Sequence, residues 1–126
     1  MKRLVLSAAV IVSMLLLGLY NGYYIQNLTN EIIYQLSCAQ STAEEERWDA
    51  ATRITQQAYE NWNRHHSYLH IVSRHNDTDE ILRTFQAVLQ YLKIQETDQY
   101  TAANIDLITQ LQLLAEMEQP TLVNIL

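Results

Sequence analysis

Histidine is the residue type in this chain whose spacing comes closest to a chemical site, because all four histidines lie in one short stretch. His66 and His70 are four residues apart, so a helix would place both imidazoles on one face, as a pair of zinc ligands requires. Asp77, Asp79 and Glu80 follow closely and could add oxygen ligands. Imidazoles also titrate near neutral pH. A metal site or a pH-sensing cluster is therefore one hypothesis for this segment.

A structural role for these histidines needs fewer assumptions. The segment lacks the glutamate that metalloprotease helices place after the first histidine, and no spacing fixes a third ligand. His65 lies on the apolar face of an expected helix, where a histidine hydrogen-bonded to the backbone or to a carboxylate is ordinary. We therefore retain only His66 and His70 as candidate metal ligands, and we expect no cofactor.

Catalytic motifs are absent from the sequence. It contains no glycine-rich phosphate loop, no Gly-x-Ser-x-Gly turn and no cysteine–histidine pair at nucleophile spacing. The acidic residues Asp49, Glu60, Glu96 and Asp106 fall mainly away from the apolar stripes described below, which indicates a solvated surface rather than a catalytic pair. We expect the protein not to be an enzyme.

The stretch between Leu4 and Tyr24 contains no charged residue and follows Lys2 and Arg3 directly. As a helix it would span roughly 31 Å, which matches the hydrocarbon core of a bilayer. Three tyrosines gather at its far end, where interfacial aromatic residues are common. We predict a transmembrane anchor over residues 1–24, with a cytoplasmic N-terminus set by the basic pair, and an extracytoplasmic body over residues 25–126.

A cleaved signal peptide is the alternative interpretation, because it also joins basic residues to an apolar run. The apolar run is not followed by the pair of small residues that a cleavage site needs; the nearest, Ser37 and Ala39, lies too far downstream. This favours an uncleaved anchor in the cell membrane. Gly18 and Gly22 form a Gly-x-x-x-Gly pair that lets two such helices associate, so a homodimer remains an alternative.

The charge balance of the body limits its partners. All fourteen acidic residues but only six of the eight basic ones lie beyond residue 24, so the body carries a formal charge of −8, six minus fourteen. Nucleic acids and anionic lipid surfaces attract basic proteins, which argues against binding to either. A single cysteine, Cys38, rules out an internal disulfide, so we expect the body to be held together by side-chain packing.

Four helices joined by short turns account for the sequence, which has only two glycines and one proline. Each expected helix carries an apolar stripe at spacings of three and four residues, typical of helices that pack at a shallow angle. The first helix, over about residues 3–41, has the stripe Ile25, Leu28, Ile32, Leu36, Ala39 and Ala43. The second has Trp48, Ala51, Thr55, Ala58, Trp62, His65, Leu69 and Val72. The third has Ile81, Leu82, Phe85, Val88, Leu89 and Leu92, and the fourth has Tyr100, Ala103, Leu107, Leu111 and Leu114.

From these stripes we predict an all-α fold in which the N-terminal transmembrane helix continues into a small antiparallel bundle of about four helices, arranged as two helical hairpins. Six residues are expected to dominate its core: Trp48, Trp62, Leu69, Phe85, Leu107 and Leu111. The sequence Trp48-Asp-Ala-Ala near the start of one expected helix is echoed by Tyr100-Thr-Ala-Ala near the start of another. The echo indicates that the two hairpins are similar.

Capping patterns predict where the later helices begin. Such a pattern places a serine, threonine or aspartate before the helix and a glutamate three residues on. The expected caps are Ser41 with Glu44, Thr42 with Glu45, Asp77 with Glu80, and Thr97 or Asp98. The apolar residues 122–126 follow Pro120 and are expected to dock on the body.

The order of these features resembles a family of short, N-terminally membrane-anchored helical proteins from Gram-positive, spore-forming bacteria that is catalogued as a domain of unknown function. The most specific parts are the spacing from Trp62 to His75, the acidic turn before Ile81 and the closing Asn124-Ile125-Leu126. The resemblance covers nearly the whole chain and implies a membrane-anchored topology, without implying an activity. The additional histidines at 65, 66 and 70 depart from the family pattern, which argues against a family role for them.

Together these observations predict an uncharacterised single-pass membrane protein whose outer helical bundle mediates protein–protein interaction in the cell envelope. Its expected partner is another membrane or envelope protein. Two alternatives remain: a histidine-based metal or pH sensor, and a structural spacer for a co-encoded membrane protein.

Overall fold

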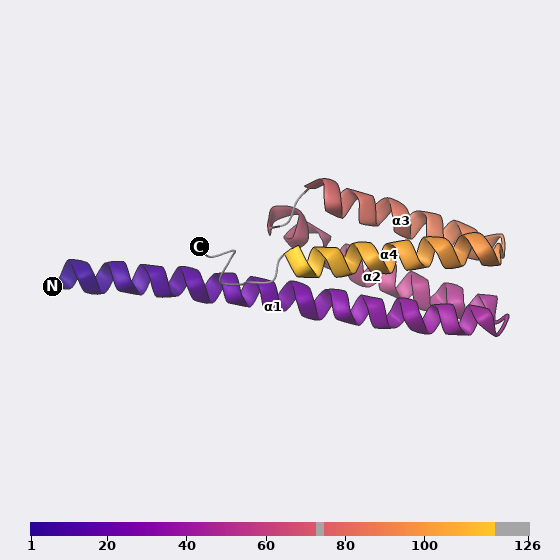
Figure 1. The fold of residues 1–126 in the computed structure, drawn as a ribbon, viewed down its shortest axis with the longest axis horizontal. Helices are drawn as coiled ribbons and strands as arrows, with labels where there is room; N and C mark the ends of the chain where they lie inside the picture. Colours follow the sequence, from indigo (N-terminus) through magenta and orange to yellow (C-terminus); the bar gives the residue numbers. More distant parts are fainter. Residues whose placement is uncertain (73–74, 118–126) are drawn as a thin grey trace.

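The computed structural model describes residues 1–72 and 75–117, and side chains are described throughout these ranges except at 21, 66–72, 75–77 and 117. This part of the chain is all-α and contains no strand. Its helices are α1 (Lys2–Glu44), α2 (Trp48–Val72), α3 (His75–Lys93) and α4 (Thr97–Met117), as Figure 1 shows. The predicted fold class, an all-α bundle of four helices with a long first helix, is confirmed.

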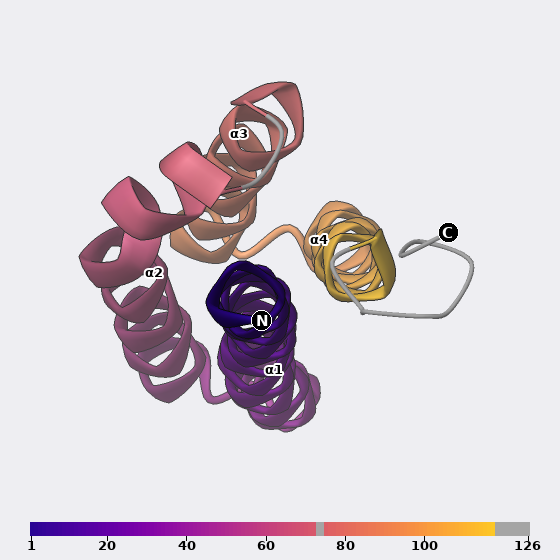
Figure 2. The same ribbon diagram turned by 90° about the vertical axis from the view of Figure 1, so that its left-hand side faces the viewer.

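The four helices form an antiparallel ring. Helix α1 packs against α2 and α4, and α3 packs against the same two helices, while the diagonal pairs do not approach each other closely in the described part of the chain. Viewed along the bundle in Figure 2, α1 lies between α2 and α4, with α3 across from it. Two hairpins, α1–α2 and α3–α4, therefore close into one bundle.

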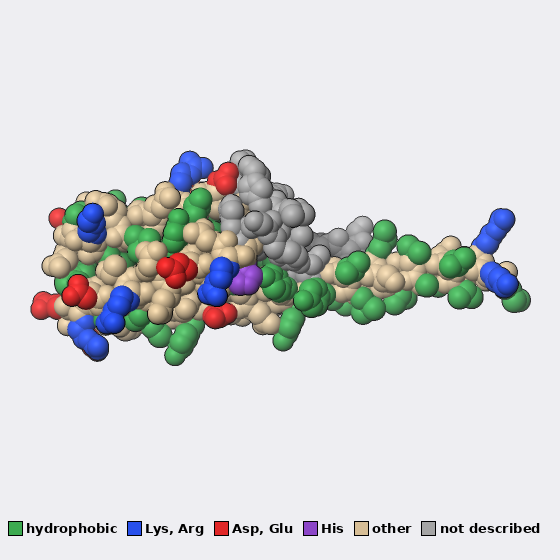
Figure 3. Space-filling view, turned by 180° about the vertical axis from the view of Figure 1, so that it is seen from behind, with side chains coloured by type: hydrophobic (Ala, Val, Ile, Leu, Met, Phe, Trp, Pro, Cys, Tyr) green, Lys and Arg blue, Asp and Glu red, His purple; other side chains and the backbone are tan. Residues whose placement is uncertain are grey.

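Helix α1 is much longer than the bundle. Its 43 residues correspond to about 65 Å of helix, and its N-terminal half projects beyond the other helices without touching them (Figure 1). In the described part of the chain it is the one helix long and apolar enough to cross a membrane, a criterion that a signal sequence also meets. Figure 3 shows hydrophobic side chains along this stem, with basic side chains at its tip and charged side chains of both signs on the bundle.

The apolar stripe on the second half of α1 is buried as predicted, because every one of its residues faces the ring. The stripe comprises Ile25, Leu28, Ile32, Leu36, Ala39 and Ala43, each at most 6% exposed. Four of the residues expected to dominate the core, Trp62, Phe85, Leu107 and Leu111, are fully buried. Trp48 is only half-buried and lies edge-on to the ring of Tyr100, with centroids 6.3 Å apart. The side chain of Leu69 lies outside the described residues.

Aromatic side chains fill the centre between α2 and α3. Phe85 is contacted by the ring of Trp62 at a centroid distance of 6.4 Å and by the ring of Tyr59 at 5.6 Å, the latter edge-to-face. Such offset and edge-on pairs add to the hydrophobic gain from burying the rings. They fix the second hairpin against the first.

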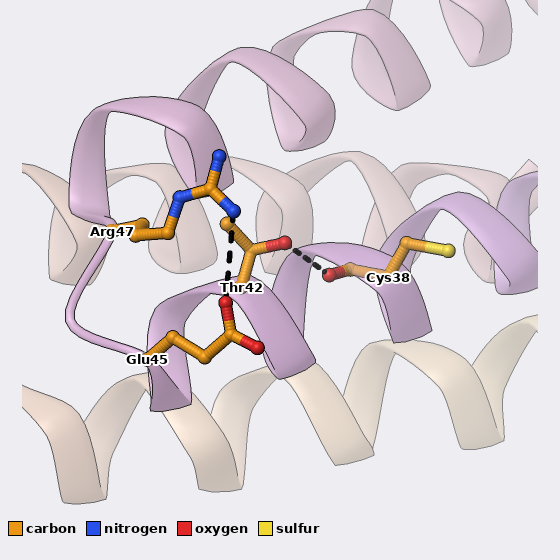
Figure 4. A network of polar contacts seen from close by, with 4 residues as sticks. All are labelled: Cys38, Thr42, Glu45 and Arg47. Carbon is orange, nitrogen blue, oxygen red and sulfur yellow. Dashed lines mark hydrogen bonds and ion pairs between the residues drawn. The ribbon is translucent and has the colours of Figure 1, made fainter.

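The predicted caps at Ser41 and Thr42 are wrong, because α1 continues through both residues to Glu44. Inside the helix the Thr42 hydroxyl donates to the Cys38 carbonyl oxygen at 2.8 Å, so it is not available as a cap (Figure 4). The physical reason is that Ala43 still lies on the buried stripe, and burial extends the helix by one more turn. The acidic residues after it occupy the helix end and the turn.

The other predicted caps also lie inside helices. Helix α3 begins at His75, so Asp77 is already helical, and α4 begins at Thr97, so the residue before it is Glu96. Helix α4 is described as far as Met117, and the predicted docking of residues 122–126 lies outside the described residues.

The two hairpin turns have the same geometry. Glu46 and Gln95 have positive φ angles of 64° and 57°. After α1, the Glu46 and Arg47 N–H groups donate to the carbonyl oxygens of Ala43 and Thr42 at 2.9 and 3.2 Å. After α3, the Gln95 and Glu96 N–H groups donate to those of Leu92 and Tyr91 at 3.2 and 3.1 Å. Both turns are therefore Schellman motifs, in which a left-handed residue ends the helix.

The two hairpins are similar at their turns, as predicted. However, the two similar sequence segments, which begin at Trp48 and Tyr100, do not occupy equivalent positions in the two hairpins. Trp48 is the first residue of α2, whereas Tyr100 is the fourth of α4. The equivalent of Tyr100 is Ala51, since each donates its N–H to the residue that follows the left-handed position, at 2.8 and 3.0 Å. Both residues are buried, so the large side chain of Tyr100 and the small side chain of Ala51 occupy equivalent positions in the two hairpins.

Replacing the left-handed residues by glycine should stabilise the bundle. A side chain at positive φ crowds the following carbonyl, so Glu46→Gly and Gln95→Gly should each raise the free energy of unfolding by roughly 0.5–1 kcal/mol. Chemical denaturation of the full chain in detergent measures this. The matched control is Glu45→Gly, at a φ of −84°, which should give no gain. Equal effects at positions 45 and 46 would contradict the assignment of the turn.

Candidate functional site

The structure describes one of the four histidine side chains. His65 is half-buried on α2, and its Nδ1 lies 2.9 Å from the Asn61 carbonyl oxygen, the backbone hydrogen bond expected of a structural histidine. Because a carbonyl oxygen can only accept, Nδ1 is the donor in this bond. The side chains of His66 and His70 lie outside the described residues, so their metal site stays a prediction. Elsewhere, within the described part, no group of three His, Cys, Asp or Glu side chains could hold a metal ion.

A cleft of about 240 Å³ lies where the bare part of α1 meets the bundle. We call it the collar cleft; it is lined by Tyr20, Tyr23, Tyr24, Asn27, Leu28, Glu31 and His65. All but His65 belong to α1 and recur every three or four residues, so they share one face of that helix. His65 comes from α2. The cleft therefore exists only because α2 packs beside this face of α1.

Ring contacts organise the collar cleft. The rings of Tyr20 and Tyr24 are stacked, with centroids 6.5 Å apart and an angle of 28° between their planes. The ring of Tyr24 also meets the imidazole of His65 at 5.7 Å, tilted by 60°. Three aromatic rings thus run in sequence from the stem towards the bundle.

The electrostatics of the collar cleft are set by one carboxylate. Glu31 is exposed, and no lysine or arginine lines the cleft. In the described part of the chain, Glu31 forms no ion pair; the ion pair found there joins Arg47 to Glu45 at 3.6 Å in the distal turn (Figure 4). The cleft therefore combines one unpaired negative charge with aromatic faces, hydroxyl groups and an amide.

A second polar feature lies inside the bundle, on a helix whose predicted stripe contained no amide side chain. Asn104 on α4 is completely buried. Its Nδ2 donates to the Leu36 carbonyl oxygen at 3.2 Å and to the Gln40 side-chain oxygen at 3.0 Å, both on α1. These bonds tie α4 to α1 near the middle of the bundle.

The predicted stripe on α4 is wrong at one position because of this asparagine. Ala103 was expected in the core but is half-buried, and the buried residue is Asn104. Tyr100, Asn104, Leu107, Leu111 and Leu114 are buried at a regular alternation of four and three residues, and Ala115 is buried beside the last of them. This regular spacing could have predicted the buried face of α4 from the sequence. It was overlooked because one of its positions is the polar residue Asn104.

The side chains of Tyr100, on α4, and Thr55, on α2, lie near each other in the centre of the bundle. Both residues are buried. Burial of the phenol raises the pKa of Tyr100 to about 12, repulsion by the Glu44 carboxylate adds to this, and the nearby Thr55 hydroxyl acts in the opposite direction. The two hydroxyl groups lie near each other without the geometry of a good hydrogen bond, so both oxygens lack a partner in the described residues. A buried hydroxyl without a partner destabilises the folded state.

Two further hollows lie on the described surface of the bundle and are wide open to solvent. One, of about 380 Å³, lies at the α1–α2 turn and the start of α2, with Arg47, Trp48 and Arg53 among its lining residues. The other, of about 500 Å³, lies between α3 and α4, with Ala87 and Ala103 among its lining residues. Neither brings together side chains that form an acid–base pair or a nucleophile.

The fold and these sites define a class of protein: an all-α bundle carried on a long helical stem that is apolar all round. Residues 19–125 match a family described as a domain of unknown function (DUF4363). The match covers most of the chain, so the protein belongs to this family. Of the resemblance, the part that is confirmed is a family catalogued as a domain of unknown function. No curated protein and no solved structure is detectably similar to it. The family region begins within α1 and therefore includes the collar cleft with the bundle.

Tyr100→Phe should remove a pH dependence of stability. In the unfolded chain a tyrosine ionises near pH 10, but in the fold its pKa is about 12. Stability is therefore fully present below pH 10 and falls as the pH rises to about 12, because only the unfolded chain releases the proton in this range. The variant should lose this fall, and at pH 7 it should be as stable as the original protein or more so, because the buried hydroxyl is gone.

Denaturation at pH 7 and pH 11 measures both effects. Tyr34→Phe is the matched control, since Tyr34 is 70% exposed, and it should keep the original pH dependence. An alkaline loss of stability that is unchanged in Tyr100→Phe would contradict the assignment.

Proposed function

We propose that this protein is a single-pass membrane protein whose bundle binds another membrane or envelope protein at a fixed height above the bilayer. The observation that carries the proposal is the continuity of α1, which runs without a break from the exposed apolar stem into the buried stripe of the bundle. A host among Gram-positive, spore-forming bacteria and an extracytoplasmic body belong to the same proposal. The orientation rests on Lys2 and Arg3 at the start of the stem.

A continuous helix is a stiff connection. Ile25, the first hydrophobic core residue of α1, comes directly after the tyrosines that end the apolar stem. No glycine-rich or proline-rich linker separates the two parts, so the bundle cannot swing freely about its anchor. Such a connection suits a body that meets a neighbour in the same membrane, because height and tilt are fixed in advance and less freedom is lost on binding.

The surface offers a site for such a neighbour on the adjacent helices α1 and α4. Tyr34 on α1 and Ile105 and Leu113 on α4 are 70%, 52% and 52% exposed, although all three are large and hydrophobic. A contiguous group of large exposed apolar side chains is typical of a protein-binding surface, and the proposal is that these three side chains belong to one. The net negative charge of the body argues against nucleic acid as the partner.

The same continuity of α1 favours a second candidate function, a structural spacer that holds the outer part of a co-encoded membrane protein at a set distance. In that role the length of the helix matters more than any exposed surface. The histidine-based metal or pH sensor remains a further alternative, which titration of the full chain with zinc would test directly through His66 and His70.

The membrane topology can be tested with single cysteines. In a Cys38→Ser background, Arg47→Cys places a thiol in the distal turn, where the arginine side chain is exposed. A membrane-impermeant maleimide added to intact cells should label it, while the control Lys2→Cys should be labelled only after the membrane is permeabilised. Equal labelling of the two, or recovery of a shortened chain in the medium, would contradict an uncleaved anchor with this orientation.

The binding surface can be tested with photo-crosslinking amino acids. Incorporated in living cells at Tyr34, Ile105 or Leu113, they should each give a crosslinked product of the same defined mass, identifiable by mass spectrometry. The control positions Gln57 and Gln86 are exposed on α2 and α3 and should give no such product. Crosslinks only at the controls would refute this surface, and a crosslinked product of twice the chain's own mass would identify a homodimer instead.

A further inference from the structure

We propose that the collar cleft binds the head group of a zwitterionic aminophospholipid, with the lipid ammonium beside Glu31 and the lipid phosphate beside the tyrosines, nearer the membrane. The inference rests on the proposed transmembrane anchor, since it needs the stem of α1 to lie in a bilayer. It goes beyond that proposal, because an anchor by itself requires no particular lipid.

The first argument is the height of the cleft. Its lining begins at Tyr20, at the end of the exposed apolar run, and reaches Glu31 eleven residues later, which is about 16 Å along the helix axis. Helical side chains point back towards the N-terminus, so the Glu31 carboxylate reaches down towards the membrane by up to one turn. The cleft thus covers the level of the lipid head groups and the layer just above it.

The second argument is the order of chemical groups along the cleft. Nearest the membrane are phenol hydroxyl groups and the imidazole of His65, which meets Tyr24. Hydroxyl and amide groups can donate hydrogen bonds to a phosphate. Farther out is the carboxylate of Glu31. A phosphoethanolamine head group has the same order, with its phosphate at the glycerol side and its ammonium outermost.

The third argument is charge. No lysine or arginine lines the cleft beside Glu31, so an ammonium group would gain an ion pair there. A lipid with a phosphate but no ammonium, such as phosphatidylglycerol, would instead bring a second negative charge to Glu31.

The fourth argument is size. The cleft volume of about 240 Å³ is below the range of about 300–1,000 Å³ typical of sites for drug-sized ligands. It therefore suits a small head group rather than an acyl chain. The chains of the bound lipid would continue along the exposed apolar face of the stem, which lies directly below.

The test uses the full chain, incorporated into nanodiscs with equal amounts of phosphatidylethanolamine and phosphatidylglycerol, released into detergent and analysed by native mass spectrometry. Phosphatidylethanolamine should be retained preferentially. Glu31→Gln, which removes the charge and keeps the shape, should reduce this preference about tenfold, as expected for the loss of one charge-assisted hydrogen bond. The matched control Glu45→Gln alters an exposed carboxylate of the distal turn and should leave the preference unchanged.

A second pair of variants tests the membrane end of the cleft. Tyr20→Leu keeps an apolar side chain and removes the hydroxyl group, so retention of phosphatidylethanolamine should fall. Gln57→Leu is the control on the outer surface of α2 and should have no effect. Both replaced side chains are exposed, so neither variant is expected to unfold the protein.

The outcomes separate the two proposals. If the chain fails to enter the nanodiscs, the transmembrane anchor itself is wrong. If it enters but retains both lipids equally, or if Glu31→Gln and Glu45→Gln behave alike, the anchor stands and the head-group site is overturned. Free phosphoethanolamine added to the detergent-solubilised chain provides the last arm: displacement of the lipid at micromolar concentration would assign the site to a soluble amine and overturn the lipid as its occupant.

Discussion

The structure depends on one constraint: the single unbroken helix α1 is uncovered along its first half and packed against other helices along its second half. Backbone groups of α1 are bonded within the helix along its whole length, so the same hydrogen-bond pattern serves both halves. Only the distribution of side chains changes. From Leu4 to Tyr20 the helix carries no charged residue on any side, whereas from Ile25 its apolar residues form one stripe. The other three helices can cover that stripe only on the second half, and this determines where the bundle begins.

Closing the ring around α1 requires two turns of the same shape, and the chain makes both without glycine. Glu46 and Gln95 adopt left-handed backbone conformations, which cost a non-glycine residue roughly 1–2 kcal/mol. Burial of Ala43 and Leu92 just before the two turns offsets this cost. The interior is likewise not purely apolar: the buried amide of Asn104 holds α4 to α1. A single buried polar residue of this kind can fix the register of packed helices at some expense in stability.

The collar cleft follows from the same arrangement. Its tyrosines lie where the stem stops being covered, and α2 reaches just far enough to bring His65 against Tyr24. The position that anchors the bundle to the stem is therefore also the position where aromatic, acidic and imidazole groups converge. Interaction with a protein through the outer faces of α1 and α4, and with a lipid at the collar, would use separate surfaces of one rigid body.

The sequence by itself determined the helices, the apolar stem and most of the core, because the spacing of Ile25, Leu36, Trp62 and Phe85 reports which face of each helix is buried. It misplaced the helix starts, since the hydroxyl of Thr42 can serve equally as a cap or bond within a helix, and only burial of the neighbouring residue decides between them. It also passed over Asn104, because a polar residue enters a core only where another helix supplies its partners. The tertiary structure alone decided the contact of His65 with Tyr24, since residues far apart in the chain meet only when two helices pack at one particular register.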